Sequence, residues 1–302
     1  MADQKDKTLL SSLCKNKGRG IPVGFIGAGR TATAIAPALL QAGWVVAAVS
    51  SLGHDSATNL AKQIGGLACR DNQAVADKSK LVFITTPSDV IPEVVKEIDW
   101  RPGQMIVHCS GADSKEVLGA AVTKGALAGV LHPLQSFAMG SSTSALEGIT
   151  FSLEADEPLL SLLKGLVGRL KANWIVIQAS ERPLYHASAA IVSNYLVTLL
   201  GAAAVIWTQF GASSQATANA LLPLMKGTIA NIEKAGLPNA LTGPISRGDV
   251  GTVKQHLKAL RKDAPEYEAL YRELGRVTIP IARAAGTLDS AGAERISRIL
   301  SE

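Results

Sequence analysis

Aromatic residues and cysteines are both scarce in this chain of 302 residues. Phe, Trp and Tyr together make up 4% of the sequence, and the net charge of +5 is not gathered into a basic stripe with interleaved rings. Nucleic-acid-binding proteins usually combine clustered Lys and Arg with stacking rings, so we expect no nucleic-acid partner. Cys14, Cys69 and Cys109 are scattered and odd in number, which fits neither a metal site nor a disulfide framework. We therefore expect free thiols, a cytoplasmic location and no bound metal.

Charged residues are also few, at 18%, whereas 47% of the residues are hydrophobic. This composition argues against long disorder, and the length suits two domains or one large α/β unit with an appendage. No apolar segment follows the charges near the N-terminus, so we expect a flexible tail over residues 1–20 and no signal peptide. The segment 189–207 is nearly long enough to span a bilayer, but Ser193, Asn194 and Thr198 interrupt it. We expect the central helix of a helical domain there, and no membrane partner.

Short apolar runs alternate with helix-like segments over residues 21–178. The expected strands are 21–27, 44–50, 80–87, 104–111, 126–133, 148–155 and 172–178. Helical segments are expected at 31–43, 56–65, 91–98 and 157–171. This alternation predicts an α/β fold, with a Rossmann-type, doubly wound and mainly parallel sheet that helices cover on both faces.

The pattern changes after Gln178, where only helical periodicity remains. We therefore predict a tail (1–20), a Rossmann NADP-binding domain (21–180) and an all-α C-terminal domain (181–302) for substrate binding and dimerisation. The long apolar helix expected over 184–210 indicates a homodimer formed through the helical domain.

A glycine-rich loop follows the first expected strand. Residues Gly27, Ala28, Gly29, Arg30 and Thr31 belong to a G-x-G-x-x-A pattern that opens the first helix. Gly27 permits the tight turn, and Gly29 lets backbone N–H groups approach a pyrophosphate at the helix N-terminus. Because strand, helix and second strand are all in place, the loop predicts dinucleotide binding; the alternative is a structural glycine turn.

The end of the second strand predicts which dinucleotide is bound. NAD-binding proteins usually carry Asp or Glu there, but this strand ends with Ser50 and Ser51. Together with Arg30, which can reach a 2′-phosphate, these hydroxyls favour NADP (NADPH) as the cofactor.

Other strand ends supply candidate substrate contacts, because ligands bind at the carboxyl ends of parallel strands. Thr86 and Pro87 are expected along the nicotinamide half of the cofactor, and Ser110 and Gln135 at the substrate. His132 directly follows its strand and is a candidate proton donor with a pKa near neutrality. The alternative is a histidine that bonds only to loop backbone.

The helix after the Rossmann domain carries a polar stripe between apolar residues. His186, Ser193 and Asn194 fall on one face, with His186 and Asn194 about 12 Å apart along the axis. Such a stripe suits the wall of a substrate cleft, or a pair bonded to neighbouring helices. Further along, Arg247 is able to hold a substrate carboxylate; an interdomain ion pair is the alternative.

The stretches GFIGAGR, HCSGA, LHPLQSF, YHASAAIVSNYLVTL and LTGPISRGD together give the sequence a family resemblance. Over residues 21–290 it resembles the Rossmann-like proteins that carry domain of unknown function 2520, in the 6-phosphogluconate-dehydrogenase-like superfamily and related to ketopantoate reductase. In ketopantoate reductases and β-hydroxyacid dehydrogenases this helix usually carries a catalytic Lys followed by two Asn. Here His186 stands in the Lys position, Ala190 replaces the first Asn and Asn194 matches the second.

In prephenate dehydrogenases, also related, a His-Pro pair after a strand supplies the catalytic His, which His132-Pro133 resembles. The resemblance thus implies catalytic roles for His132, His186 and Asn194, with Ser193 at the substrate. It favours an NADPH-dependent reductase of a small 2-oxo acid, with ketopantoate (2-dehydropantoate) the leading candidate and pantothenate biosynthesis the implied setting. The alternatives are a reductase of cyclic imines such as pyrroline-carboxylate, or a non-catalytic NADP-binding sensor or scaffold.

Overall fold

The structure is a computed structural model that describes residues 20–138 and 143–302. Residues 1–19 of the expected tail, with Cys14, lie outside the described part. The chain divides into two compact units, one ending at Ser193 and one covering Asn194–Glu302.

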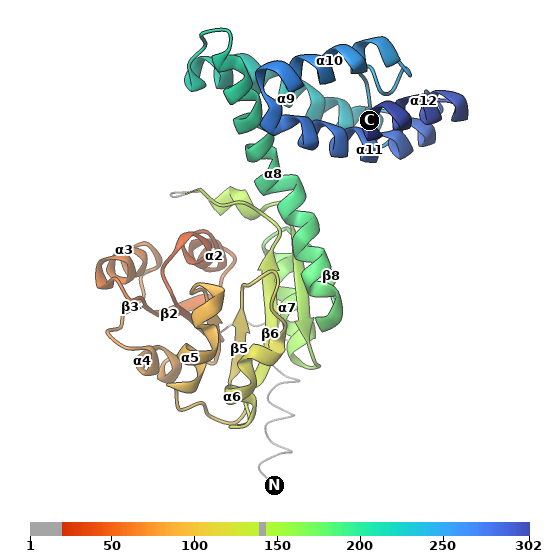
Figure 1. The fold of residues 1–302 in the computed structure, drawn as a ribbon. Coiled ribbons are helices and arrows are strands. Elements are labelled where there is room, and N and C mark those ends of the chain that lie inside the picture. Colours follow the sequence, from red (N-terminus) through yellow and green to blue (C-terminus); the bar gives the residue numbers. More distant parts are fainter. Residues whose placement is uncertain (1–19, 139–142) are drawn as a thin grey trace. The chain divides into compact units, whose positions relative to one another are not determined.

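The first unit is built on an eight-stranded sheet with the order β3-β2-β1-β4-β5-β6-β7-β8 (Figure 1). Its strands are β1 (Pro22–Ile26), β2 (Val45–Ser50), β3 (Leu67–Ala68), β4 (Leu81–Ile84), β5 (Met105–His108), β6 (Leu127–Pro133), β7 (Thr150–Ala155) and β8 (Asn173–Val176). All neighbouring strands are parallel except β6 and β7. Each expected strand is present; β3 was missed because two residues are too short to show a periodicity.

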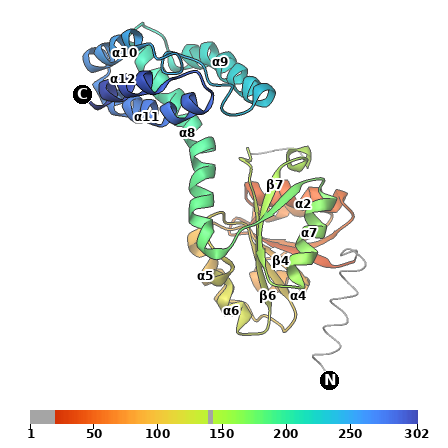
Figure 2. The same ribbon diagram turned by 90° about the vertical axis from the view of Figure 1, so that its right-hand side faces the viewer.

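Helices cover both faces of this sheet. They are α2 (Arg30–Gln41), α3 (His54–Ile64), α4 (Asn72–Asp77), α5 (Ile91–Lys96), α6 (Gly119–Val122) and α7 (Leu159–Arg169). Short 3₁₀ turns are η1 (Ser88–Val90), η2 (Lys115–Leu118), η3 (Thr143–Leu146) and η4 (Ala179–Glu181). Figure 2 shows α2 and α7 on one face and α5 and α6 on the other.

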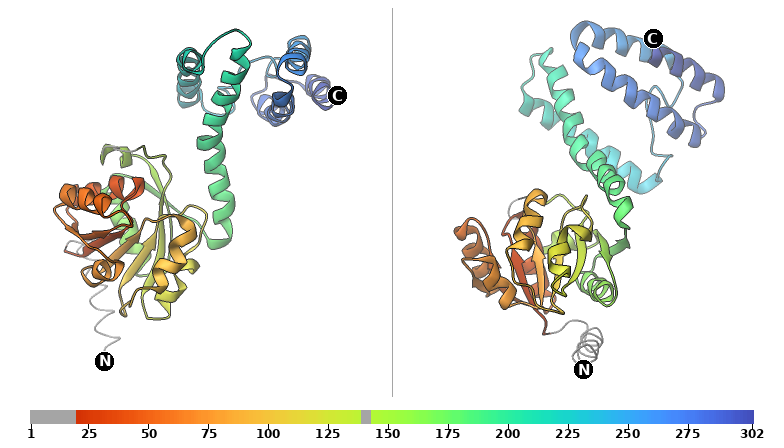
Figure 3. Two further views of the ribbon diagram at one scale, coloured as in Figure 1. Left: turned by 60° about the vertical axis from the view of Figure 1, so that its left-hand side comes forward. Right: turned by 60° about the horizontal axis from the view of Figure 1, so that its bottom comes forward.

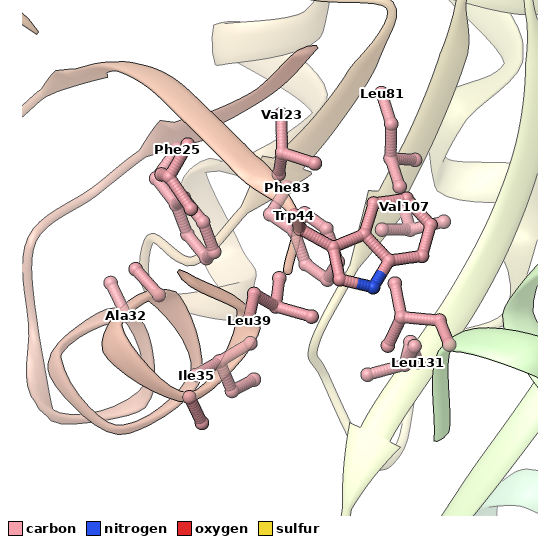
Figure 4. Packing of buried hydrophobic residues seen from close by; sticks show 14 of the residues in the cluster. Val23, Phe25, Ala32, Ile35, Leu39, Trp44, Leu81, Phe83, Val107 and Leu131 are labelled. Atoms are coloured by element: carbon pink, nitrogen blue, oxygen red, sulfur yellow. The ribbon is translucent and has the colours of Figure 1, made fainter. Parts of the chain in front are cut away.

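The sheet separates two buried apolar clusters, because successive side chains of a strand point to opposite faces. Phe25 and Phe83 stack with ring centroids 4.9 Å apart in the cluster under α2, α3 and α7 (Figure 4). Ile26 and Ile84, the next residues along, belong to the cluster under α4, α5 and α6. Each of these fully buried side chains contributes roughly 2 kcal/mol through removal from water. This two-sided burial explains why the strands are apolar along their whole length.

The second unit is entirely helical in its described elements. It contains the end of α8 (Arg182–Thr208), then α9 (Ser214–Ala235), α10 (Val250–Asp263), η5 (Pro265–Tyr267), α11 (Glu268–Ala284) and α12 (Ser290–Ser301). Val253 and Leu257 of α10 pack with Ile296, Ile299 and Leu300 of α12 in its core. The right-hand view of Figure 3 shows these blue helices side by side. The predicted fold class, a Rossmann-type mainly parallel sheet followed by an all-α region, is confirmed.

The two compact units meet inside α8, between Ser193 and Asn194. The boundary expected from the sequence, at residue 180, marks instead the change from strands to helices, since the last strand ends at Val176. One continuous helix belongs to both units, so the functional division into a cofactor domain and a substrate domain stays a prediction.

Helix α8 differs from the expected central helix in its exposure. The segment Ala179–Thr208 is long and apolar enough to cross a membrane by length and composition, and its most apolar 18-residue window has a mean hydropathy of 2.0 and no buried residue. Its side chains Leu184, Val192 and Val197 are 78%, 74% and 72% exposed. A helix that is apolar on all sides is normally buried, so in the single chain α8 lacks the cover that its composition predicts.

Candidate active site

The loop between β1 and α2 has the geometry expected of a dinucleotide-binding turn. Gly27 has φ +101°, and a Cβ there would lie 2.7 Å from the backbone carbon of Thr85, so no larger residue fits. The Thr85 hydroxyl donates to the Gly27 carbonyl at 2.8 Å, and the Thr85 N–H donates to the Ile26 carbonyl at 2.8 Å. These bonds fix the loop against the end of β4.

The N-terminus of α2 is open. Gly29 caps the helix with no side-chain hydrogen bond, and a Cβ at Gly29 would meet no atom within 4 Å. Arg30 is exposed, Ala28 is buried and Thr31 is half-buried. Because N–H groups of a first helical turn lack partners within the helix, this uncapped end is suited to an anion such as a pyrophosphate. Residues 27–29 lie between β1 and α2 as predicted, whereas Arg30 and Thr31 already belong to the first turn of α2.

The structure corrects the expected role of Ser50. Its side chain is 2% exposed and its hydroxyl donates to Asn72 Oδ1 at 2.7 Å, so its only proton is used inside the fold. Ser51, the next residue, is half-buried. The sequence pattern could not reveal this, because Asn72 lies on α4, beyond the unrecognised strand β3.

Arg70 is a candidate cofactor contact that the sequence analysis missed. Strand β3 pairs with β2 in the register Ala48 to Leu67 and Val49 to Ala68, and the Cys69 N–H donates to the Val49 carbonyl at 2.8 Å. Arg70 follows Cys69 directly, so it comes just after the last backbone bond between these two segments. Arg70 is exposed. Besides Arg30 on α2, it is a second guanidinium that can serve as a cofactor contact.

The end of β4 carries an unsatisfied polar atom. Thr86 Oγ1 is buried and has no hydrogen-bond partner among the described residues. A buried polar atom without a partner costs about 1–3 kcal/mol, and most such atoms in proteins are satisfied by protein, water or ligand. Pro87, which follows, is exposed. Together with the open helix end, Thr86 fits a cofactor that lies along this edge of the sheet.

Ser110 lies in a loop that is held tightly from within. Its hydroxyl donates to Asp113 Oδ2 at 2.7 Å and accepts from Ser88 Oγ at 3.0 Å and from the Asp113 N–H at 3.3 Å. These bonds use the one donor and both acceptor positions of a hydroxyl. Ser110 is therefore at the expected strand end, but direct contact with a substrate requires it to exchange one of these partners.

His108 shapes the same loop. The ring is fully buried; Nδ1 accepts from the Ser110 N–H at 3.1 Å, so Nε2 carries the proton and donates to the Ser114 carbonyl at 3.0 Å. Burial lowers the pKa of His108 to about 4. These contacts give His108 a structural role in the loop.

His132, Tyr185 and His186 form an aromatic cluster around Gly111. His132 Nδ1 lies 2.9 Å from the Tyr185 hydroxyl, and the His132 ring lies edge-on to that of His186 with centroids 6.0 Å apart. A Cβ on Gly111 would lie 2.9 Å from His132 Nε2 and would also overlap His186 Nδ1. Only glycine therefore fits at 111, and both imidazoles turn a nitrogen toward this one position.

Arg182, the first residue of α8, lies behind this cluster and is fully buried. Its Nε donates to the Asp113 carbonyl at 2.6 Å, and its Nη2 donates to the Ser110 carbonyl at 3.0 Å. Glu154 Oε2 lies 3.7 Å from Arg182 Nε and is its carboxylate partner. Arg182 thus ties α8 to the loop 110–113.

The electrostatics of the cluster correct one expectation. Burial lowers the pKa of His132 to about 4, and the charge of Arg182 acts in the same direction. We expected a pKa near neutrality for a proton-donating His132; the buried ring is instead neutral at pH 7. Burial also raises the pKa of Tyr185, so that its hydroxyl keeps its proton.

Other predicted residues are not gathered at this cluster. Gln135 is exposed, and its Oε1 accepts from the Ser136 N–H at 2.8 Å. Ser193 is exposed on α8. Asn194 and Arg247 are exposed and belong to the second unit, which is described by itself. Among the described residues, no group of three or more His, Cys, Asp or Glu side chains is placed to hold a metal ion.

The sequence analysis missed Tyr185, Arg182, Ser152, Glu154 and Asp113 at this site. These residues come from β7, α8 and a loop, and they meet only when the sheet and helix pack. One signal was available for Tyr185, which directly precedes the candidate His186.

Comparison with known proteins follows the same division of the chain. A family model for a Rossmann-like domain matches residues 11–133, and the model for domain of unknown function 2520 (DUF2520) matches residues 149–278. The chain is a Rossmann-like protein with a DUF2520 domain. The Rossmann-like region contributes the glycine loop and His132, whereas the DUF2520 region contributes Arg182, Tyr185 and His186. No curated protein matches the sequence.

Several solved structures share the fold. A protein of Thermotoga maritima is 27% identical, with a TM-score of 0.70 over 87% of this chain and 98% of its own. A candidate NADP oxidoreductase from Bacteroides fragilis is 24% identical, with a TM-score of 0.70 over 86% and 98%. A reductive aminase from Aspergillus terreus, solved with NADPH and ethyl levulinate, is 16% identical, with a TM-score of 0.62 over 93% and 98%.

Proposed function

We propose that this protein is an NADPH-dependent reductase of a small carbonyl substrate. One observation carries the proposal. The glycine loop follows β1, Thr86 follows β4, Gly111 follows β5 and His132 lies at the carboxyl end of β6, and these four strands are parallel neighbours. Tyr185 and His186 of α8 join His132 and Gly111 there. Ligands of doubly wound folds bind at this edge. The NADP-related and NADPH-bound proteins that share the fold support this choice of cofactor.

Residues 27–31 would hold the pyrophosphate through the open N-terminus of α2. Arg30, Ser51 and Arg70 would hold the 2′-phosphate that distinguishes NADP from NAD, because guanidinium groups bind phosphate strongly. Thr86 and Pro87 would lie along the nicotinamide half. A bound NADPH supplies a hydride, which is chemistry of the cofactor and not of the chain.

The chain's own contribution is to bind and polarise the substrate. His132 is neutral and partly exposed, so it acts as a hydrogen-bond donor and not as a cationic acid. His186 is exposed beside His132, which makes it the better candidate for the general acid. Asn194 would orient the substrate, with Gln135, Ser193, Ser110 and Arg247 as candidate contacts for its polar groups.

A neutral donor favours a carbonyl over an imine. A carbonyl oxygen accepts hydrogen bonds, whereas a protonated imine nitrogen has no lone pair left to accept one. We therefore keep a branched 2-oxo acid as the substrate class, with ketopantoate the leading candidate and pantothenate biosynthesis the setting. Reduction of a cyclic imine is the second candidate, because the fold is shared with a reductive aminase.

The exposed α8 supports a homodimer. Leu184, Val192 and Val197 are exposed on α8, and Leu224 and Ile229 on α9 are 66% and 47% exposed. Exposed apolar side chains of this kind on long helices mark an interface, and we propose that a second copy covers them in the cytoplasm. Sedimentation of the purified protein tests this: a monomer at micromolar concentration would contradict it.

The function is tested by mixing purified protein with NADPH and a panel of 2-oxo acids and cyclic imines, followed at the nicotinamide absorbance. We expect turnover with a branched 2-oxo acid. Turnover with imines alone would move the assignment to the second candidate. Tight NADPH binding without any turnover would support a non-catalytic sensor or scaffold instead.

A further inference from the structure

We propose that Tyr185 is a positioning residue that fixes His132 as an Nε2–H donor, through a one-way chain of hydrogen bonds that starts at Arg182. The chain runs Arg182, Ser152, Tyr185, His132, and all four residues belong to the first compact unit. Its catalytic consequence rests on the proposed reductase function, whereas its direction follows from the hydrogen bonds alone.

Arg182 sets the direction, because a guanidinium has donors and no acceptor. Its Nη2 lies 3.5 Å from Ser152 Oγ, so Ser152 receives this long bond and cannot return it. Ser152 is fully buried on β7, directly opposite His132 on β6 in the antiparallel register. The two side chains therefore lie on the same face of the sheet.

The proton of Ser152 then has one destination. Burial raises the pKa of Tyr185, whereas a side-chain hydrogen bond with Ser152 acts to lower it, which is the effect of a group that donates to the phenol oxygen. Among the described residues, Arg182 is the other partner of the Ser152 hydroxyl. If Tyr185 donated to Ser152, the Ser152 proton would be buried without an acceptor, which is costly. The favoured arrangement has Ser152 donating to the Tyr185 oxygen.

The proton of Tyr185 is left for His132. The Tyr185 oxygen lies 2.9 Å from His132 Nδ1, so Nδ1 accepts. A neutral imidazole that accepts at Nδ1 carries its single proton on Nε2. Burial supports both ends of this bond, since it favours the protonated phenol of Tyr185 and the neutral ring of His132.

Nε2 is also the nitrogen turned toward Gly111. Because residue 111 has no side chain, the position where a Cβ would lie 2.9 Å from His132 Nε2 is left to the two imidazoles, His186 Nδ1 being the other nitrogen beside it. A fixed Nε2–H at this point can donate to a substrate carbonyl oxygen. Such a preorganised donor stabilises the negative charge that develops on that oxygen during reduction.

The hydrogen-bond direction is tested without substrate or cofactor. Long-range ¹H–¹⁵N spectra of the unliganded protein, labelled at histidine, report which ring nitrogen carries the proton, and His132→Gln assigns the signal. We expect the Nε2–H form to predominate in the wild type. In Tyr185→Phe the preference for Nε2–H should fall by about fivefold, the equivalent of one typical hydrogen bond. Predominance of the Nδ1–H form in the wild type would overturn the proposal.

Two further variants make the test specific. Ser152→Ala removes the middle member of the hydrogen-bond chain and should also weaken the preference of His132 for the Nε2–H form. This variant keeps the test available if Tyr185→Phe does not fold. Tyr271→Phe is the matched control, because Tyr271 lies 2.9 Å from His256 Nδ1 in the second unit. It should leave the His132 signal unchanged; an unchanged His132 signal in Ser152→Ala and Tyr185→Phe alike would contradict the proposal.

Kinetics separates this inference from the function. Tyr185→Phe should lower kcat by about tenfold or more while the Kd of NADPH stays the same, because the donor tautomer is no longer fixed. Absence of turnover in the wild type, with the Nε2–H tautomer present, would refute the reductase function and leave the chain intact. A kcat unchanged by Tyr185→Phe despite a changed tautomer would refute the positioning role.

Discussion

The chain contains two histidine–tyrosine pairs of nearly the same geometry and very different surroundings. His132 and Tyr185 have an Nδ1-to-oxygen distance of 2.9 Å, centroids 5.7 Å apart and planes at 89°. His256 and Tyr271 have 2.9 Å, 5.7 Å and 84°. His132 and Tyr185 lie at the sheet edge next to Arg182, which is fully buried. His256, in contrast, is exposed on α10. Pair geometry alone therefore does not mark a site; the groups behind the pair decide what it can do.

The buried surroundings act on the first pair in two ways. Arg182 and Ser152 give its hydrogen bonds a direction, and burial keeps His132 neutral by lowering its pKa to about 4. A surface pair has water as an alternative partner, so neither its tautomer nor its orientation needs to be fixed. Four predictions test this contrast, in order of decreasing expected effect.

Replacing each histidine by alanine should give the largest difference. His132→Ala removes the proposed hydrogen-bond donor and should lower kcat by roughly 10²–10³-fold, the loss expected for one preorganised donor, with NADPH affinity little changed. His256→Ala should leave kcat unchanged. Steady-state kinetics with the substrate found in the panel measures both. Equal kcat values for the two variants would break the comparison.

Replacing the arginine behind the first pair should mainly cost stability. Arg182→Met leaves Glu154 buried without its charge partner and should lower the free energy of unfolding by about 3 kcal/mol. Arg261→Met, which removes an exposed ion pair with Glu268 in the second unit, should cost less. Urea denaturation followed by circular dichroism measures both losses, and a larger loss for Arg261→Met would contradict the distinction.

Changing the glycine loop should block the binding of NADPH at the sheet edge where His132 and Tyr185 lie. Gly29→Val places a branched side chain at the open start of α2, so NADPH binding should weaken at least tenfold while the fold survives. Fluorescence titration gives the Kd, and circular dichroism checks the fold. Gly251→Val serves as a control substitution outside the sheet edge. Normal NADPH binding by Gly29→Val would show that this loop is not the site.

Removing the arginine next to β2 should have the smallest effect. Arg70→Ala should reduce the preference for NADPH over NADH by about fivefold, since it removes one guanidinium contact to a solvated phosphate. Arg30→Ala should act in the same direction, and Ser50→Ala should not change the preference, because Ser50 bonds to Asn72. Titrations with both reduced cofactors measure the ratio. If Ser50→Ala changed the ratio of the two Kd values and Arg70→Ala did not, Ser50 and not Arg70 would be the cofactor contact.

The sequence alone determined the features that depend on neighbours along the chain. Gly27 and Gly29 predicted the turn between β1 and α2. The turn needs a positive φ, which Gly27 has, and an open helix start, which Gly29 leaves free. Seven strands were visible because burial on both faces makes each of them apolar throughout. His132-Pro133 was recognisable as the end of a strand. The placement of these residues on one sheet edge followed from parallel pairing.

Only the tertiary structure decided which of these groups are free to act. Ser50 looked available until β3 and α4 brought Asn72 within 2.7 Å of it. His132 looked like a titrating acid until tertiary packing buried it and lowered its pKa to about 4. The same packing places Tyr185, 53 residues later in the chain, beside its Nδ1. Arg182 was not predicted as a site residue, because it lies in a charged, turn-like stretch of the sequence. In the structure it is fully buried. The hydrogen-bond partners and the burial of a side chain depend on contacts between segments that are distant in the chain. Local sequence patterns do not show which of these segments will meet.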